Sequence, residues 1–131
     1  MNVRGNTFVF GDRIDTDVLA PGPYMREPMS VLASHCLEAV DPRFASEVRP
    51  GDIVVGGESF GIGSSREQAV QALAELGVGA IIAKSFARIF YRNALNLGVP
   101  ALVCSDLEAA RGDELEVLPV EGRIINHTSG R

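Results

Sequence analysis

The sequence of 131 residues contains no tryptophan, only two cysteines and no run rich in lysine or arginine. Its formal net charge is -5. An acidic chain without a basic cluster matches neither a nucleic-acid surface nor an anionic membrane. Its apolar runs are too short to span a bilayer, and the first ten residues lack the apolar core of a signal peptide. We therefore expect a cytoplasmic protein that binds neither nucleic acid nor membrane.

Cys36 and Cys104 lie far apart, each within an apolar segment. Their spacing matches no metal or redox motif, so we interpret both as small buried hydrophobic residues in a reducing compartment. An iron–sulfur cluster needs several cysteine thiolates, and this chain has no such set. We therefore expect the chain itself to bind no metal and no cofactor.

The composition, 46% hydrophobic and 22% charged, is typical of one soluble domain with its own core. No repeat, linker or low-complexity segment divides the chain, so residues 1–131 are predicted to form a single domain. Six short runs are predicted to be strands: Thr7–Phe10, Asp52–Val55, Ala80–Ala83, Ala101–Cys104, Leu115–Leu118 and Arg123–Asn126. Most are almost continuously apolar, which is expected of strands covered on both faces.

Helical patterns separate some of these strands. One follows Gly63 and ends at Gly77, a second runs from Phe86 to about Leu97 with Ser85 as N-cap, and a weaker third covers Ser30 to Val40. Strands and helices alternate from Asp52 to Cys104, which predicts two successive β-α-β crossovers with parallel strands. The last third is predicted to form a hairpin, so the expected fold is α/β with a mixed sheet.

A glycine-rich turn joins the strand at Asp52–Val55 to the helix that follows. Residues 61–67 read Gly-Ile-Gly-Ser-Ser-Arg-Glu. Such a turn presents the backbone amides of Gly61, Gly63 and their neighbours, together with the positive end of the helix dipole, to an anion. The dinucleotide and Walker patterns both fail here, so the turn alone does not choose between phosphate, sulfate and carboxylate.

The same residues also fit a purely structural role. Ser64 and Glu67 match the capping box, in which the serine side chain bonds the amide three residues later. However, Arg66 places a cation where the helix dipole disfavours it by about 0.3–1 kcal/mol, and a bound anion would offset that cost. Both interpretations of the turn stay open.

Three ordered motifs carry a family resemblance. They are residues 11–21, beginning Gly-Asp-Arg-Ile-Asp-Thr-Asp, residues 61–67, and residues 84–93, reading Lys-Ser-Phe-Ala-Arg-Ile-Phe-Tyr-Arg-Asn. Together they are similar to the swivelling domain of the aconitase superfamily, and as a separate chain the sequence resembles small subunits of the isopropylmalate isomerase and homoaconitase type. The resemblance implies a swivelling β/β/α fold. It also implies a large partner subunit that carries a [4Fe–4S] cluster, and a reaction that removes and re-adds water.

The resemblance also assigns residues. Ser64 matches the family's catalytic base, which takes a proton from the carbon beside a carboxylate, and amides at a helix N-terminus would stabilise its alkoxide. Arg66 matches a ligand of a substrate carboxylate, a role that suits the two-pronged guanidinium. Ser65 matches a neighbouring substrate-contacting hydroxyl. Thr16 and Asp17 match a pair that lines the active site, where Asp17 would support proton transfer.

The loop at residues 24–28 matches the family's contact with the variable substituent of the substrate. Tyr24 and Met25 favour an apolar isopropyl group, whereas Arg26 favours a further carboxylate. We favour isopropylmalate, and homoaconitate or another 2-hydroxy acid such as dimethylmalate remains an alternative. A non-catalytic anion-binding or regulatory module is the alternative of another class. His35 and His127 match no catalytic position.

Overall fold

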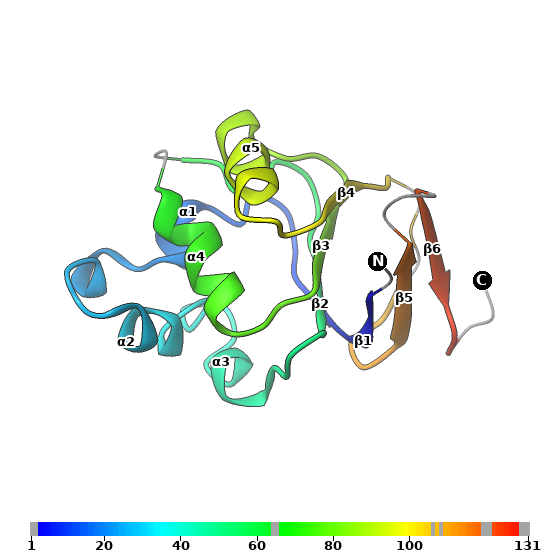
Figure 1. Ribbon diagram of the computed structural model, residues 1–131, viewed down its shortest axis with the longest axis horizontal. Helices are drawn as coiled ribbons and strands as arrows, with labels where there is room; N and C mark the ends of the chain where they lie inside the picture. The colour runs from blue at the N-terminus through cyan, green and yellow to red at the C-terminus, as the bar shows by residue number, and fades with distance from the viewer. Residues whose placement is uncertain (1–2, 64–65, 106, 108, 119–121, 129–131) are drawn as a thin grey trace.

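The computed structural model describes residues 3–63, 66–105, 107, 109–118 and 122–128. Six strands in this part of the chain form one sheet of order β4-β3-β2-β1-β5-β6 (Figure 1). They are β1 (Val3–Val9), β2 (Ile53–Val55), β3 (Ala80–Ala83), β4 (Ala101–Val103), β5 (Glu114–Leu118) and β6 (Arg123–Asn126). The helices are α1 (Thr16–Leu19), the 3-10 turn η1 (Gly22–Tyr24), α2 (Met29–Ser34), α3 (Phe44–Glu47), α4 (Glu67–Glu75) and α5 (Arg88–Asn96).

The strand pairing confirms the predicted mixed sheet. Strands β1 to β4 are parallel, and α4 and α5 connect β2 to β3 and β3 to β4. Strand β5 pairs antiparallel with β1, and β6 pairs antiparallel with β5, so the predicted hairpin is also present. No helix within the described ranges is long and apolar enough to cross a membrane.

Apolar residues on both faces of the central strands explain the layering. Val54 and Ile81 point into the larger core, which α4, α5 and the shorter helices complete. Ile53 and Ile82 point the other way, into a smaller core that Leu115 and the rest of the β5–β6 hairpin cover. The helices and the hairpin therefore lie on opposite sides of the parallel strands (Figure 1). Burial on both faces is the reason that these strands are continuously apolar.

The ends of the helices correct two predictions. Gly77 and Gly98 follow α4 and α5 with φ of 83° and 75°, as expected of glycine after a helix. Ser85 is not the N-cap of α5: that position is Ala87, and the Ser85 hydroxyl instead accepts a hydrogen bond from the Ser59 amide. Helix α2 ends at Ser34, earlier than predicted, because Leu37 adopts a φ of 61° and its amide turns to the carbonyl of Val18.

The cysteines lie apart, and no disulfide joins them. Cys36 is completely buried, and burial raises the pKa of its thiol far above the ordinary value, so it is not a ready thiolate. Cys104 is partly buried beside the smaller core.

Candidate functional site

Three loops meet at the carboxyl ends of β1, β2 and β3. The loop after β2 lies between the other two: the Gly61 amide donates to the Ile14 carbonyl, and the Phe60 amide donates to the Ser85 carbonyl. The loop after β1 makes a second contact, in which the Thr16 amide donates to the Ile62 carbonyl at 2.9 Å. The carboxyl edge of a parallel sheet is the usual place for a ligand in an open α/β fold.

The glycine-rich turn needs Gly61 for a packing reason. Gly61 has a φ of 83°, and a Cβ there would lie 2.2 Å from Cγ of Phe90. Phe90 in turn meets the buried ring of Phe60 edge-on, with centroids 5.3 Å apart. The absence of a side chain therefore allows the turn to lie directly on α5. Since the Gly61 amide is already bonded to Ile14, it does not serve as an anion donor.

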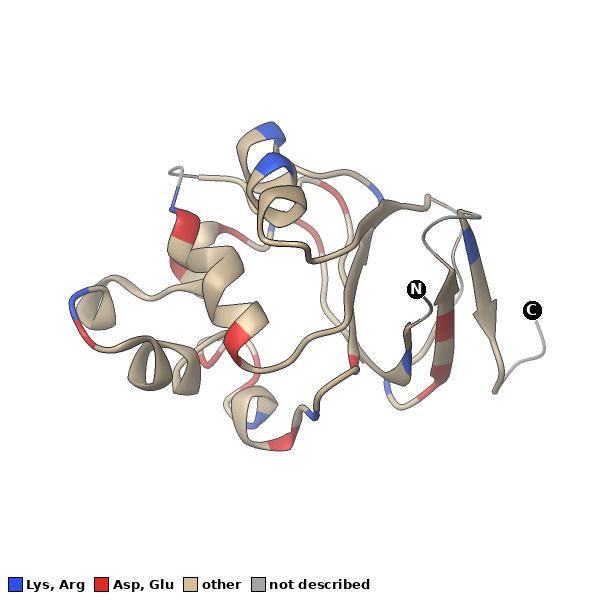
Figure 2. Cartoon of the chain, in the orientation of Figure 1, with Lys and Arg blue, Asp and Glu red and all other residues tan. Residues whose placement is uncertain are grey.

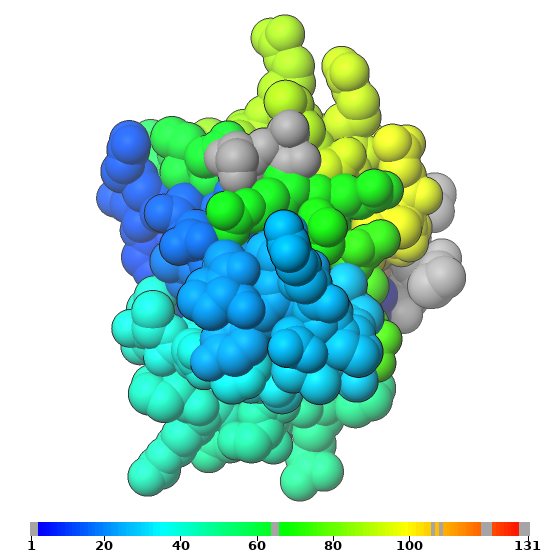
Figure 3. Space-filling model, turned by 90° about the vertical axis from the view of Figure 1, so that its left-hand side faces the viewer, coloured from blue at the N-terminus to red at the C-terminus, as the bar shows by residue number. Residues whose placement is uncertain are grey.

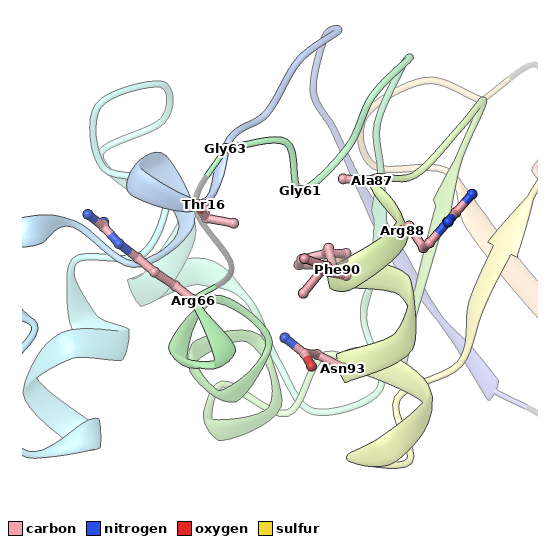
Figure 4. A pocket seen from close by; sticks show the side chains of 9 residues that line it. Thr16, Gly61, Gly63, Arg66, Ala87, Arg88, Phe90 and Asn93 are labelled. Carbon is pink, nitrogen blue, oxygen red and sulfur yellow. The ribbon is translucent and has the colours of Figure 1, made fainter.

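A pocket of about 360 Å³ opens between the turn, α1, α4 and α5 (Figure 4). Its lining is Thr16, Gly61, Gly63, Arg66, Ala87, Arg88, Ile89, Phe90 and Asn93. Although acidic residues outnumber basic ones by 17 to 12, the described lining has two arginines and no acid. Helix α5 likewise carries basic residues and no acidic one (Figure 2). Because positively charged side chains attract negative charge, the pocket favours an anion.

Thr16 and Gly63 form one wall of the pocket. Thr16 is buried, and a Cβ on Gly63, whose φ is 112°, would lie 3.2 Å from the Thr16 hydroxyl oxygen. The Thr16 side chain points toward the cavity in Figure 4. Asp15 caps α1, accepting from the Val18 amide at 2.8 Å, and so fixes the turn that presents Thr16. Thr16 therefore lies at this pocket, and its role in substrate binding stays a prediction.

Arg66 lines the pocket, but its guanidinium is turned toward Asp17. Its Nη1 donates to Oδ1 of Asp17 at 2.8 Å and to the carbonyl of Ala20 at 3.0 Å. The hydrogen bond from Arg66 and, to a lesser extent, one from the Gly22 amide hold the pKa of Asp17 below its ordinary value. Asp17 is therefore ionised at neutral pH, which makes it a weak base and leaves it no proton to donate.

Tyr24 and Arg26 do not line the pocket. The Tyr24 ring stacks on His35, with centroids 3.6 Å apart and planes 2° from parallel. His35 also contacts Glu38, with Nδ1 and Oε1 2.6 Å apart. The Arg26 side chain is exposed. In Figure 3 the segment from η1 to α2 and helix α5 lie on either side of α4.

Ser64 and Ser65 lie outside the described residues. Their sequence neighbours Gly63 and Arg66 both line the pocket. The N-cap of α4 is Arg66, without a side-chain capping bond, so the helix begins later than the predicted capping box requires.

Asn93 and Arg88 line the pocket without having been predicted as site residues. Both belong to the third motif, whose helical pattern was recognised. Asn93 follows Phe90 by three residues and Ile89 by four, the spacings that share one helix face. That spacing was the available signal, but nothing in the sequence marked Phe90 as facing a cavity.

The described residues contain no cluster of three or more histidine, cysteine, aspartate or glutamate side chains arranged to hold a metal ion. The buried Cys36 and the distant Cys104 do not fit the thiolate set of an iron–sulfur cluster.

The comparison with known families decides the classification. The model of the aconitase C-terminal domain matches residues 26–106, more than half of the chain. The chain belongs to this family. The methanogen homoaconitase small subunit of Methanothermobacter thermautotrophicus is 52% identical over 98% of this chain and 75% of its own length. The 3-isopropylmalate dehydratase small subunit 2 of Archaeoglobus fulgidus is 50% identical over 99% and 80%.

A solved structure extends the match to three dimensions. The crystal structure of a 3-isopropylmalate dehydratase chain from Methanocaldococcus jannaschii superposes with a TM-score of 0.95, at 45% identity, over 100% of this chain and 79% of that one. The resemblance drawn from the three motifs and the fold expected from it are thereby confirmed for this aconitase-family chain.

Proposed function

We propose that the chain is the small subunit of a two-chain hydro-lyase that interconverts 2-isopropylmalate and 3-isopropylmalate by removing and re-adding water. The observation that carries the proposal is the pocket, which joins Thr16, Gly63 and Arg66 in a described lining without an acidic side chain. Relatives named 3-isopropylmalate dehydratase small subunit, 46–50% identical, support this choice of reaction. We place the enzyme in the cytoplasm, since the chain has two cysteines and no disulfide.

The large subunit completes the site in this proposal. That subunit would hold a [4Fe–4S] cluster, which would supply Lewis-acid chemistry for the substrate hydroxyl. The present chain lacks a thiolate set, and it contributes carboxylate binding and proton transfer instead. A partner must then cover the pocket mouth, which excludes water and strengthens the electrostatic interactions inside.

Ser64 is the proposed base. Gly63 and Arg66, which flank Ser64 and Ser65 in the sequence, both line the pocket. A serine hydroxyl is a poor base in water. The cationic lining and the helix N-terminus would stabilise its alkoxide while it takes a proton from the carbon beside a carboxylate.

Arg66 is the proposed carboxylate ligand, and Thr16 and Ser65 are the proposed neighbouring hydroxyl contacts. In the isolated chain the guanidinium uses Nη1 for Asp17 and Ala20. We infer that substrate competes with this contact and draws the guanidinium into the cavity. Asp17 then acts on Arg66 and not on the substrate proton.

Homoaconitate is a second candidate substrate. The exposed side chain of Arg26 suits an additional carboxylate, and methanogen homoaconitase small subunits are 50–52% identical to this chain. Tyr24, whose ring is covered by His35, offers less apolar surface for an isopropyl group than its sequence position suggested. Both candidates share the reaction and the same Arg66 contact.

The test is reconstitution. The chain is purified alone and together with its cognate large subunit, and each is assayed on 2-isopropylmalate, homocitrate, dimethylmalate and citrate. We expect no turnover by the chain alone and turnover of 2-isopropylmalate by the complex. Turnover of homocitrate alone would select the second candidate. A chain that binds an anion by itself and a complex that turns over none of the four would instead indicate a non-catalytic module.

A further inference from the structure

Asn93 is a pocket residue to which neither the motifs nor the proposed reaction assigns a role. It lies on α5 and lines the cavity together with Thr16 and Arg66. Figure 4 shows its carboxamide projecting from α5 into the space beside α4. Within the described part of the chain no hydrogen bond to this carboxamide is found. A polar group that faces a pocket without a protein partner is available to a ligand.

The surroundings of Asn93 make a ligand contact favourable. Ala87, Ile89 and Phe90 form the rest of the α5 wall and are apolar. A ligand that fills the cavity removes water from the carboxamide, and these neighbours offer no side-chain hydrogen bond in its place. The ligand itself must therefore accept from Nδ2, or the buried amide costs free energy.

The charge of the pocket limits the chemistry of that ligand. Arg66 and Arg88 line the pocket and its described lining has no acid, so the pocket favours an anionic ligand that draws the Arg66 guanidinium away from Asp17. Arg66 and Asn93 come from different helices, α4's N-cap and α5, and in Figure 4 their side chains point in different directions. A substrate with two carboxylates offers an acceptor group to each of these two walls.

We propose that Asn93 is a substrate-binding residue whose Nδ2 donates a hydrogen bond to a carboxylate oxygen of the 2-hydroxy dicarboxylate, on the opposite wall from Arg66. This rests on the proposed function. Because the amide is uncharged and takes no part in the proposed proton transfer, it binds substrate and transition state alike. Its loss therefore raises KM and leaves kcat nearly unchanged.

The experiment compares Asn93 with Asn96, which lies on the same helix, is exposed and does not line the pocket. Asn93→Ala, Asn93→Asp, Asn96→Ala and Asn96→Asp are each assembled with the large subunit and assayed on whichever of the four acids the wild-type complex turns over. We expect Asn93→Ala to raise KM by about 10- to 100-fold, the range for one hydrogen bond to a charged group. Asn93→Asp should raise KM further, because two carboxylates repel. Both Asn96 variants should keep the wild-type KM.

Thermal unfolding of the isolated variants and gel filtration of the complexes exclude misfolding and failed assembly. An unchanged KM in both Asn93 variants, with an active wild type, overturns the inference and leaves the proposed function standing. Equal KM increases in the Asn93 and Asn96 variants also overturn it, since they indicate an effect on α5 as a whole. A wild-type complex inactive on all four acids overturns the proposed function, and this inference with it.

Discussion

Arg66 and Asp17 form an ion pair in which the guanidinium Nη1 lies 2.8 Å from the carboxylate Oδ1. The same Oδ1 accepts the Gly22 amide at 3.2 Å, at the start of η1. Asp17 thereby links the N-terminus of α4 to the loop that carries Arg26. Because the Asp17 side chain is largely exposed, the pair adds little to stability. The ion pair instead determines the orientation of the Arg66 side chain.

Asp17→Asn tests whether Asp17 orients Arg66 or transfers a proton. The asparagine keeps an acceptor but loses the charge, so Arg66 leaves it more readily for the substrate. Since an exposed ion pair contributes about 0.2–1 kcal/mol, we expect KM to change by no more than about fivefold, with kcat preserved. Steady-state kinetics of the complex provide the measurement. A fall in kcat of about 10²-fold or more would show that Asp17 takes part in acid–base catalysis.

Arg66→Lys should weaken substrate binding while the fold stays intact. Lysine keeps the charge but loses the planar, two-pronged geometry that matches a carboxylate. We expect KM to rise at least about 10-fold, as for the loss of one charge-assisted hydrogen bond. Arg92→Lys, at an exposed position of α5 outside the pocket lining, is the control. Equal KM and kcat for both variants and the wild type would show that Arg66 does not bind the substrate.

Gly61→Ala should destabilise the chain more than Gly98→Ala. Both glycines have positive φ, so each alanine costs about 1–2 kcal/mol of backbone strain. A Cβ at Gly61 also meets Phe90 at 2.2 Å, whereas nothing lies within 4 Å of a Cβ at Gly98. The clash should add about 1–3 kcal/mol. Thermal unfolding measures the difference, at about 3–6 °C for each kcal/mol in a domain of this size. Equal Tm values for the two variants would mean that the turn does not pack on Phe90 as described.

The isolated chain should contain neither iron nor acid-labile sulfide after purification without a tag. Cys36 is buried with a raised thiol pKa, and Cys104 lies in another part of the fold. Metal analysis and a sulfide assay give the result directly. Stoichiometric cluster iron in the chain alone would contradict the proposal that the large subunit binds the cluster.

Much of the fold was predictable because local patterns and tertiary packing agree. The strand at Ala80–Ala83 is apolar at every position, and the sheet buries it on both faces. Boundaries were harder to predict where side chains have two possible partners. Ser85 fits an N-cap by sequence, but the adjacent β2 loop offers it the Ser59 amide instead.

The candidate site was predictable only where a motif identified it. The motifs led to Thr16, Gly63 and Arg66, and these residues do meet at one pocket. They did not show that Arg66 turns to Asp17 or that Tyr24 stacks on His35, because both contacts depend on how the helices and loops pack. Asn93 was missed for the same reason: its exposure to a cavity depends on how α5 packs against the turn after β2.

The most direct test of the central claim is the turnover number of the Ser64→Gly variant in the assembled enzyme. Since the N-cap of α4 is Arg66 and not Ser64, the substitution removes no cap and should leave Tm and assembly nearly unchanged. If Ser64 is the base, kcat should fall by about 10²- to 10⁴-fold. The assay uses the large subunit in excess, so that weaker assembly of the complex is not mistaken for a slower chemical step. A kcat within about threefold of the wild type, well short of the loss expected on removing a catalytic base, would contradict the account.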